Sequence, residues 1–316
     1  MRAIRHHEFG PPDVLVLEEV PDPRPAPGQL RVQVEAVGVH LLDTSIRSGE
    51  SFGPMARPDL PTVPGREVAG TVDAVGEGVS AAWLGRRVVA HLGPTGGGYA
   101  EQAVVAADRA HAIPAGLTAE LAVAAIGTGR TATAILDLAE LGPGDVVAVT
   151  AAAGGLGVLL VQAAVAAGAQ VVGLAGGPAK VELVRTLGAQ VTVDYLADGW
   201  VDLVPEPTIV LDAVNGPVGQ ALYERLAPGG RIVRYGWSSG EENAYDDPDR
   251  PVVDVLGPTL LARLPQLERE SLDAAADGSR VPLVTTFPLA GAAAAHRALQ
   301  ERRTTGKVVL AVGAER

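Results

Sequence analysis

The chain has 316 residues, 47% of them hydrophobic and 20% charged, with a formal net charge of −12. This composition excludes a disordered chain, and the acidic balance argues against binding to nucleic acid or to anionic membranes. Because the chain contains no cysteine, disulfides, thiolate catalysis and every zinc site with cysteine ligands are excluded. The length suggests about two domains.

Residues 1–119 predict a β-rich domain. Residues 29–39 and 67–75 are rich in Val and Ala, as strands are, and clusters of Pro and Gly at 21–25 and 64–65 indicate turns between strands. The first residues lack the apolar core of a signal peptide, so we expect a cytoplasmic protein.

From about residue 120 the pattern predicts strands that alternate with short helices. Strands are predicted at 146–150, 170–175, 190–194, 208–212 and 231–236. Helices are predicted at 158–168, 178–187 and 217–226. Pro178 suits a helix start and Gly188 a helix end. Such alternation is typical of a doubly wound parallel sheet that helices cover on both faces.

An uncharged run at 146–177 is long enough to span a bilayer. Three glycines interrupt it, at 154, 155 and 157, and a buried strand followed by a packed helix has the same composition. We therefore interpret the run as a strand and a helix of the parallel-sheet domain.

The last 50 residues favour β-structure again. Residues 281–287 and 308–312 predict strands on either side of a helix at 290–301. We expect this segment to return to the first domain. The predicted division is therefore one domain from 1–119 with 261–316, and a second domain from 120–260.

The sharpest motif is a glycine-rich turn at the end of a predicted strand and the start of a helix. Its residues are Ala152, Ala153, Gly154, Gly155, Leu156 and Gly157. Glycines there allow a tight turn and a close approach of a pyrophosphate, and the helix N-terminus offers free N–H groups. A second strand follows, as a dinucleotide site requires, although a tight turn in an ordinary parallel sheet has the same pattern.

The end of that second strand bears on the choice of cofactor. NAD sites usually place a carboxylate there for the ribose 2′-hydroxyl. This chain has Gly176 and Gly177, with Lys180 just beyond, and Tyr195 closes the third strand. An ammonium without a competing carboxylate favours the 2′-phosphate of NADPH. The alternative is that Lys180 is a solvated helix residue and Tyr195 a residue at the edge of the core.

These features resemble the zeta-crystallin-like, zinc-free quinone oxidoreductases of the medium-chain dehydrogenase/reductase superfamily. Similar motifs follow in the same order along nearly the whole chain, at 38–49, 64–70, 76–79, 97–101, 129–132, 152–157, 212–216, 228–233 and 305–310. The resemblance implies a GroES-like catalytic domain built from both chain ends, a Rossmann domain between them, and a homodimer. It further implies cofactor contacts from Thr131, Asn215, Tyr235, Gly236 and Lys307, in addition to the glycine-rich turn, Gly176, Gly177, Lys180 and Tyr195.

The resemblance also concerns metal and catalysis. The zinc branch of the superfamily uses Cys and His ligands, but this chain has no Cys, and Arg66 stands in place of the usual His, so no metal site is expected. The family's active-site loop usually carries Asn where this chain has His40, and tyrosines common on that loop are replaced by Ser45 and Ser51.

His40 and Asp43 are the candidate catalytic residues. An imidazole titrates near neutrality, so His40 is a candidate proton donor, with a hydrogen-bonded scaffold residue as the alternative. Asp43 either reacts or orders the loop.

The expected function is NADPH-dependent hydride transfer to a quinone or an α,β-unsaturated carbonyl substrate. Two alternatives stay open, namely a specialised biosynthetic enzyme resembling an enoyl reductase, and a non-catalytic NADPH-binding protein.

Overall fold

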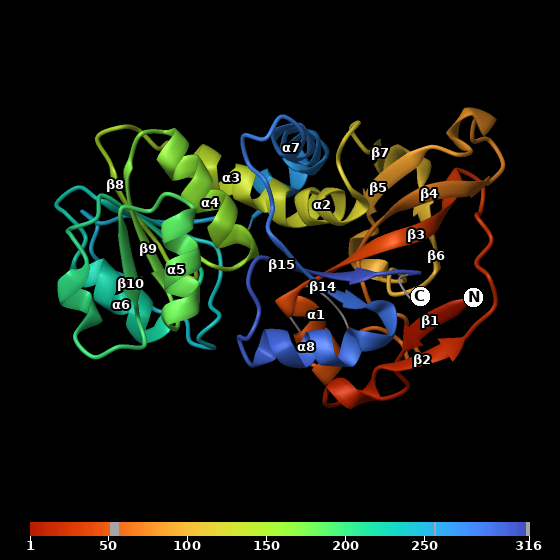
Figure 1. The fold of residues 1–316 in the computed structure, drawn as a ribbon, viewed down its shortest axis with the longest axis horizontal. Helices are drawn as coiled ribbons and strands as arrows, with labels where there is room; N and C mark the ends of the chain where they lie inside the picture. The colour runs from red at the N-terminus through yellow and green to blue at the C-terminus, as the bar shows by residue number, and fades with distance from the viewer. Residues whose placement is uncertain (51–56, 256, 314–316) are drawn as a thin grey trace. The chain divides into compact units, whose positions relative to one another are not determined.

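The computed structural model describes residues 1–50, 57–255 and 257–313, so Ser51, which was compared with the family's active-site loop, lies outside the described residues. The chain divides into two compact units, which we call unit 1 (Met1–Thr128 with Pro282–Arg316) and unit 2 (Gly129–Val281) (Figure 1). Both boundaries lie later in the chain than the expected 119/120 and 260/261.

The later boundaries follow from how two helices pack. Helix α2 (Ala119–Ala124) packs against the sheet of unit 1, whereas α7 (Pro258–Ala276) packs against α3 (Arg130–Ala139) in unit 2. Arg130 and Glu268 form an ion pair at 2.5 Å, and Arg263 binds Asp137 at 2.8 Å, so charged pairs connect α3 to α7. The segment after residue 260 therefore belongs to unit 2 as far as Val281.

Unit 1 has nine strands and three α-helices among its described residues. They are β1 (Arg2–Arg5), β2 (Val16–Glu19), β3 (Gln29–Val39), α1 (Leu41–Ser48), β4 (Glu67–Val75), β5 (Arg87–His91), β6 (Gln102–Ala106), β7 (Ala110–Ala112), α2, β14 (Val284–Pro288), α8 (Ala292–Gln300) and β15 (Lys307–Ala311). The larger sheet has the order β14-β15-β3-β4-β5-β7, and β6 also pairs with β3. Strand β15 is antiparallel to β3, with Val308 opposite Val39, which confirms that the C-terminal strand returns to the N-terminal sheet.

Strand β3 is long enough to contribute to two hydrophobic cores. Leu30 and Val32 are buried with residues of β4, β5 and β6, and Val37 and Val39 are buried with Leu310 and the apolar face of α8. Apolar side chains of this size stabilise a fold by about 1.5–3 kcal/mol each when fully buried. These two cores fix the ends of β3 and β4, where the candidate catalytic residues lie.

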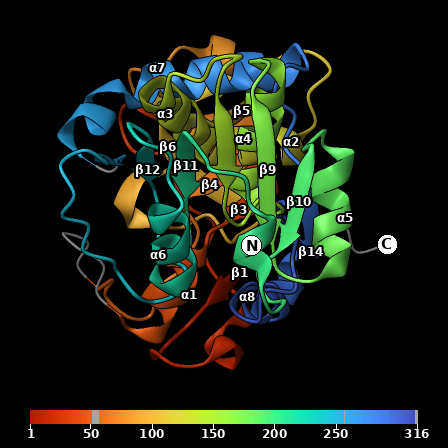
Figure 2. The ribbon, with the colours of Figure 1, turned by 90° about the vertical axis from the view of Figure 1, so that its left-hand side faces the viewer.

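Unit 2 is built around a six-stranded sheet in which every neighbouring pair is parallel. Its elements are α3, β8 (Val146–Val149), α4 (Gly155–Ala166), β9 (Gln170–Ala175), α5 (Pro178–Thr186), β10 (Val191–Asp194), β11 (Ile209–Asp212), α6 (Gly216–Glu224), β12 (Arg231–Arg234), β13 (Val252–Asp254) and α7. The order is β10-β9-β8-β11-β12-β13, and Figure 2 shows β9 and β10 side by side with α5 next to them.

Helices cover both faces of this sheet. Val147 and Val149 of β8 are buried in the core that contains Leu159 of α4, whereas Ala148 is buried in the core that contains Leu222 of α6. Because successive strand residues point to opposite faces, a fully apolar strand needs cover on both sides. The doubly wound parallel sheet predicted from the strand–helix alternation is therefore confirmed.

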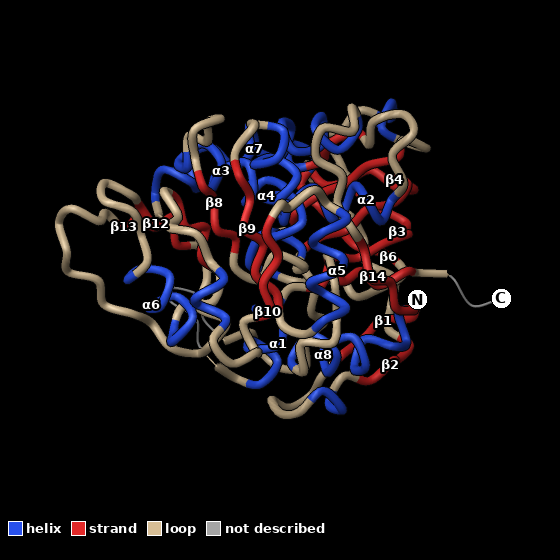
Figure 3. The backbone as a smooth tube through the Cα atoms, turned by 60° about the vertical axis from the view of Figure 1, so that its left-hand side comes forward, coloured by secondary structure: helices blue, strands red, loops and turns tan. Residues whose placement is uncertain are grey.

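The predicted elements differ from the observed ones mainly at their edges. Helix α4 begins at Gly155, three residues before its predicted start, because glycines weaken the helical pattern of the first turn. Strand β13 and helix α7 were not predicted. A three-residue strand carries no pattern, and α7 contains Pro265. The stretch between β12 and β13 is a long loop (Figure 3).

One described helical stretch, Ala119–Ala139, is long and apolar enough to cross a membrane. Most of it is buried inside the protein, as in the core helices of globular folds, and composition alone is weak evidence for a span. The uncharged run at 146–177 forms β8, α4, β9 and the turns beside them, which confirms its interpretation as strand and helix.

Candidate functional site

The glycine-rich turn joins the end of β8 to the start of α4. Gly157 lies in the first turn of α4, where a Cβ atom would stand 2.6 Å from the Cα of Ala152, so only glycine allows this close packing. The N–H of Ala152 donates to the carbonyl of Leu174 at 2.9 Å, which holds the turn against β9. The N-cap is Gly154, which has no side chain, so no side chain caps α4. The first N–H groups of the helix are thus available to an anion.

The ends of β9 and β10 meet beside this turn. Gly177 has a φ of +89°, a backbone conformation that strongly favours glycine. Its N–H donates to Oδ1 of Asp194 at 3.0 Å, and the N–H of Leu196 donates to the same oxygen at 3.0 Å. The second strand carries no carboxylate of its own, as the sequence shows, but the third strand brings one to the same place.

Of the two residues predicted to hold a 2′-phosphate, Tyr195 directly follows Asp194 in the chain, and Lys180 lies three residues after Gly177. Lys180 is in the first turn of α5 and is partly exposed. A Cβ atom on Gly176 would lie 3.4 Å from Cε2 of Tyr195, so the tyrosine ring stands over the end of β9. The predicted Gly176, Gly177, Lys180 and Tyr195 therefore belong to one edge of the sheet.

The order of the strands reverses at β8 and β11: the chain runs from β8 to β9 and β10 on one side, and from β11 to β12 and β13 on the other. A hydrogen-bonded network closes the ends of β8 and β11. Thr150 Oγ1 donates to Oδ1 of Asp212 at 2.9 Å and accepts from the N–H of Ala213 at 2.8 Å. Asp212 also accepts from the N–H groups of Val214 and Asn215. Burial raises the pKa of Asp212, and these donors oppose the rise. In doubly wound sheets, ligands bind outside the carboxyl ends of strands at such a switch point.

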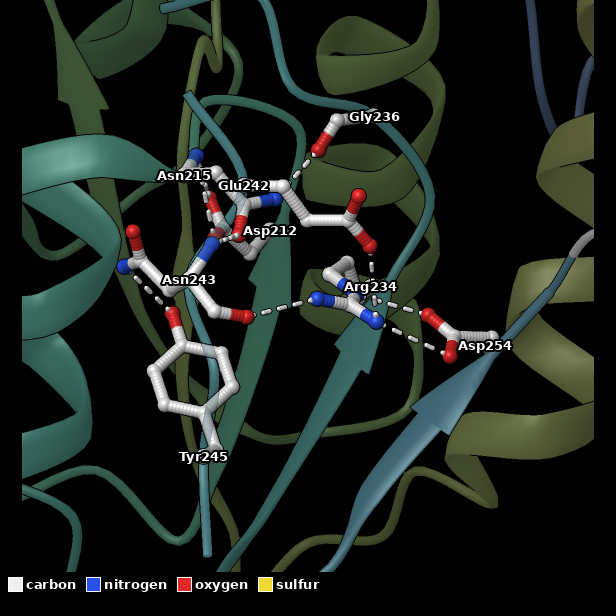
Figure 4. Close-up of polar contacts among 8 residues, drawn as sticks. All are labelled: Asp212, Asn215, Arg234, Gly236, Glu242, Asn243, Tyr245 and Asp254. Carbon is white, nitrogen blue, oxygen red and sulfur yellow. Dashed lines mark hydrogen bonds and ion pairs between the residues drawn. The ribbon is translucent and has the colours of Figure 1, made fainter.

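Asn215 connects β11 to β12 at the same edge. Its φ is +55°, and its amide nitrogen donates to the carbonyl of Gly236 at 2.6 Å (Figure 4). Asn243, on the loop after β12, donates to Gly216 at 2.8 Å and to the hydroxyl of Tyr245 at 2.9 Å. The predicted Asn215 and Gly236 thus contact each other directly.

Arg234, at the end of β12, anchors the loop beside Asn215. Its guanidinium donates to Asp254 at 2.6 Å and to the carbonyl of Asn243 at 3.0 Å (Figure 4). A cavity of about 530 Å³ lies here, lined by Arg234, Glu242, Asn243, Ala244, Tyr245, Val252 and Asp254. By contrast, the predicted Tyr235 is only 8% exposed, and burial raises its pKa.

The other predicted cofactor residues, Thr131 and Lys307, lie elsewhere in the fold. Thr131 is in the first turn of α3 and is partly exposed. Lys307 begins β15 in unit 1 and is only 4% exposed. In unit 1, Lys307 is part of a charged cluster that the sequence did not indicate.

That cluster consists of His40, Glu67 and Lys307, at the ends of β3, β4 and β15. Nε2 of His40 lies 2.6 Å from Oε1 of Glu67, and Nζ of Lys307 lies 2.9 Å from Oε2. Nζ of Lys307 is also 2.8 Å from Nε2 of His40. Glu67 is fully buried, whereas the His40 side chain is 26% exposed. The cluster is therefore open to solvent only at the imidazole.

Two glycines make the space that the Glu67 carboxylate occupies. A Cβ atom on Gly38 would overlap Oε2 of Glu67, and one on Gly127 would overlap Oε1. Burial alone would raise the pKa of Glu67, but the charges of His40 and Lys307 hold it well below its usual range. Burial lowers the pKa of Lys307, and the Glu67 carboxylate opposes that effect. Glu67 is thus a built-in buried anion.

Asp43 lies in the first turn of α1, three residues after His40, and is only 3% exposed. Its Oδ2 accepts from the backbone N–H of His40 at 2.8 Å, and Arg66 Nε lies 3.4 Å from its Oδ1. The hydroxyl of Tyr99 donates to Asp43 at 3.4 Å and contacts Nε2 of His296 at 3.0 Å. These contacts place Asp43 as the residue that fixes the start of α1, and therefore the backbone of His40.

Sequence reasoning missed Glu67, Asp194 and Asp212 as functional candidates. Glu67 was part of the 64–70 motif, and its pairing with Gly38 across β3 and β4 would have required the strand register. Asp212 ends a strand that was predicted, so a rule that examines every polar residue at a carboxyl strand end would have found it.

Comparison with known proteins identifies the family. Two family models match, the alcohol dehydrogenase GroES-like domain over residues 26–115 and the zinc-binding dehydrogenase over residues 155–257. A quinone oxidoreductase of Pseudomonas aeruginosa is 33% identical and aligns over 98% of this chain and 99% of its own length. The chain belongs to the zinc-free quinone oxidoreductase branch of the medium-chain dehydrogenase/reductase superfamily.

Relatives of this quinone oxidoreductase-like chain have varied names. A 2-haloacrylate reductase of a Burkholderia species is 33% identical, over 96% of this chain and 97% of the relative. The crystal structure of Escherichia coli quinone oxidoreductase complexed with NADPH has a TM-score of 0.86 and 28% identity, over 98% of this chain and 100% of that one. The structure of an NAD-dependent alcohol dehydrogenase has a TM-score of 0.87 and 31% identity, over 99% of this chain and 100% of that one. Unit 1 is the GroES-like domain of this family, and unit 2 is its Rossmann domain.

Proposed function

We propose that this chain is an NADPH-dependent oxidoreductase that reduces a quinone or an α,β-unsaturated carbonyl compound without zinc. The observation that carries the proposal is the glycine-rich turn at the switch point of the sheet, with its uncapped helix N-terminus. A pyrophosphate fits there because free N–H groups and the positive end of the helix dipole both favour an anion. The NADPH complex of the Escherichia coli quinone oxidoreductase supports the same cofactor, whereas the similar alcohol dehydrogenase is NAD-dependent.

NADPH, when bound, supplies a hydride, so the chain's own residues must bind it, orient it and provide a proton. Residues 153–157 would hold the pyrophosphate, and Lys180 with Tyr195 would hold the 2′-phosphate. The carboxylate of Asp194 would repel that phosphate, but two backbone N–H groups already bind the Asp194 oxygen that faces Gly177. The balance between Lys180 and Asp194 therefore sets the preference between NADPH and NADH.

His40 would supply the proton. It is the one member of the buried charged cluster in unit 1 whose side chain is substantially exposed. Reduction of a quinone or of an activated alkene adds a hydride and then a proton, and an imidazole suits proton transfer near neutral pH. Asp43 is buried and hydrogen-bonded to the His40 backbone, so its contacts support a positioning role.

The chemistry of the side chains supports a zinc-free site. The chain contains no cysteine, and Arg66 carries a positive charge next to Asp43 and Glu67. The ammonium of Lys307 already neutralises the buried Glu67 carboxylate. We expect no stoichiometric zinc by elemental analysis after dialysis. One zinc per chain would contradict this part of the proposal.

The substrate class is tested by turnover. Purified protein is mixed with NADPH or NADH and with a panel of quinones, enones and 2-haloacrylates, and cofactor oxidation is followed by the loss of absorbance of the reduced nicotinamide. We expect faster turnover with NADPH and activity on at least one quinone or enone. NADPH binding without turnover of any acceptor would instead indicate a non-catalytic protein.

A further inference from the structure

Asn215 has an unusual backbone conformation for a residue that carries a side chain. It is fully buried at the start of α6, and its φ of +55° and ψ of −155° lie in a region that glycine adopts freely and other residues adopt only under strain. Its N–H donates to the carboxylate of Asp212 at 3.2 Å, so the turn after β11 holds it in this conformation. Glycine would relieve the strain, so the amide side chain accounts for an asparagine here.

The side-chain amide of Asn215 joins two segments of unit 2. Its Nδ2 donates to the carbonyl of Gly236 at 2.6 Å, and its Oδ1 accepts from the backbone N–H of Asn243 at 3.4 Å (Figure 4). Both partners belong to the first part of the loop after β12, residues 236–245, which we call the strap. The amide therefore ties the strap to the turn after β11 both at its start and near its end.

Backbone hydrogen bonds fasten the chain on either side of a bulge in the strap. The N–H of Tyr235 donates to the carbonyl of Asp212 at 2.9 Å. The N–H of Ser238 donates to the carbonyl of Ala213 at 3.0 Å. The two acceptors are adjacent in the chain, whereas the two donors are three residues apart, so residues 236–237 bulge out between them. The carbonyl bound by the amide is in this bulge, where the backbone pairing alone does not fix it.

Two glycines of α6 allow the strap to lie directly on the helix. A Cβ atom on Gly216 would stand 2.9 Å from Oγ of Ser239, and one on Gly219 would stand 2.9 Å from the hydroxyl of Tyr245. These separations are too short for ordinary contact, so a side chain at either glycine would push the strap away. Asn243 supplies a second side-chain tie, since its Nδ2 donates to the carbonyl of Gly216 at 2.8 Å.

The strap lies at the edge of the sheet that the second half of a dinucleotide would use. Doubly wound sheets bind a dinucleotide across the switch point, with one half on each side of it. Lys180 and Tyr195, which would hold the 2′-phosphate, are on the side of β9 and β10. The nicotinamide half would therefore lie at the carboxyl ends of β11 and β12, where the strap begins.

We propose that Asn215 is a positioning residue, whose side-chain amide holds the strap and the bulge at Gly236 in the conformation that receives the nicotinamide half of the cofactor. The inference rests on the proposed NADPH-dependent function for its ligand. The tie between the amide and the strap stands on the geometry of the chain alone. A strap that is already ordered reduces the conformational entropy that is lost when the cofactor binds.

The first measurement is amide hydrogen exchange in the full-length protein without cofactor. In Asn215→Gly the side-chain amide is lost, and the backbone keeps its conformation without strain. We expect the N–H groups of Ser238 and Asn243 to exchange about tenfold faster than in wild type, because two hydrogen bonds to the strap are lost. The N–H groups of β8, in the middle of the same sheet, should not exchange faster. Unchanged exchange in the strap would overturn the proposal.

The second measurement separates the two halves of the cofactor. The probes are NADPH and 2′-phospho-ADP-ribose, which lacks the nicotinamide, and both affinities are measured by calorimetry. Asn215→Gly should weaken NADPH about three- to tenfold and leave the affinity for 2′-phospho-ADP-ribose within about twofold. Lys180→Ala should weaken both, since both carry the 2′-phosphate. Equal losses for the two probes in Asn215→Gly would overturn the positioning role, because general damage to unit 2 affects both halves.

A control variant and a second strap variant complete the set. Glu140 also has a positive φ, +47°, but it is an exposed residue at the end of α3, outside the strap and the turn after β11. Glu140→Gly relieves the backbone in the same way and should leave strap exchange and both affinities as in wild type. Asn243→Ala leaves Asn215 in place and removes the tie to Gly216, so it should speed strap exchange and weaken NADPH more than 2′-phospho-ADP-ribose. Faster strap exchange in Glu140→Gly, or wild-type behaviour of Asn243→Ala, would contradict the proposal.

The two proposals fail separately. If wild type binds neither probe, the NADPH-dependent function falls, and the exchange rates alone decide whether Asn215 holds the strap. If wild type binds NADPH and Asn215→Gly binds it equally well despite faster strap exchange, the proposed function stands and the positioning role of Asn215 falls.

Discussion

No side chain can stand at position 127 while Glu67 keeps its place, because a Cβ atom there would overlap Oε1 of the buried carboxylate. Gly127→Ala should therefore displace Glu67 and lower the free energy of unfolding by about 1–3 kcal/mol, as overpacking does. Urea unfolding measures the change. Gly144→Ala is the control, since no atom lies within 4 Å of a Cβ there and a change under about 0.5 kcal/mol is expected. Equal effects of the two substitutions would contradict the steric coupling.

His40 should affect turnover more than cofactor binding. His40→Asn removes the proposed proton donor, and general acid catalysis contributes at least about a hundredfold, so kcat should fall by about that factor. The affinity for NADPH, measured by fluorescence titration, should stay within about twofold, since His40 lies in unit 1 and the glycine-rich turn in unit 2. His7→Asn, on the surface, should change neither. An unchanged kcat and pH–rate profile would make His40 a scaffold residue.

Lys180 should discriminate between the two cofactors. A charge-assisted hydrogen bond contributes about 1.5–3 kcal/mol, so Lys180→Ala should weaken NADPH binding by about ten- to a hundredfold. NADH, which lacks the 2′-phosphate, should bind almost as before. The contrast should decrease at high salt, because ions screen an exposed pair. Equal losses for both cofactors would show that the phosphate lies elsewhere.

Asp194 should act in the opposite direction. Asp194→Asn keeps an oxygen that can accept from Gly177 and Leu196, but it removes a negative charge near the expected 2′-phosphate. We expect NADPH to bind about two- to tenfold more tightly, with little change for NADH, because two like charges close to a surface repel by a few kcal/mol at most. Asp198→Asn, an exposed residue of the same loop, is the charge-matched control. Tighter binding of both cofactors would contradict this explanation.

The free energy of unfolding should decrease as the pH falls below 7, because of His296. Burial lowers the pKa of this histidine to about 4, from 6.5. The unfolded chain therefore binds more protons than the folded one between these values, so His296 contributes stability at pH 7 that is lost as pH falls toward 4. When the pH is lowered from 7 to 5, the free energy of unfolding should decrease by about 2 kcal/mol more in the wild type than in His296→Gln. Urea unfolding at both pH values measures this, and parallel losses in the two proteins would refute it.

The sequence predicted the sites that depend on local pattern. The glycine-rich turn, Gly176, Gly177 and the alternation of strands and helices follow from backbone requirements within a few residues of each other. Asp194 was missed as a neighbour of Gly177 because its carboxylate reaches across from the next strand, and strand neighbours are not visible in a linear pattern.

The charged cluster of unit 1 was even harder to predict from the sequence, because its members come from distant parts of the chain. Glu67 and Lys307 are 240 positions apart in the chain, and their ion pair requires both the antiparallel pairing of β3 with β4 and that of β15 with β3. Lys307 was predicted to bind the cofactor only through resemblance, and that role stays a prediction. The structure gives it a buried partner that no spacing rule could have indicated.

The pairing of β15 with β3 also has a consequence for the order of synthesis. Residues Ala36–Val39 of β3 leave the ribosome long before Val308–Ala311, which are their partners along that edge. A strand edge with unpaired N–H and C=O groups is a template for wrong pairing. The nascent chain must therefore carry this apolar edge uncovered while the whole of unit 2 is made. Slow translation after β3, or a truncation before β15, should expose it to aggregation, whereas chaperones that shield strand edges should raise the yield.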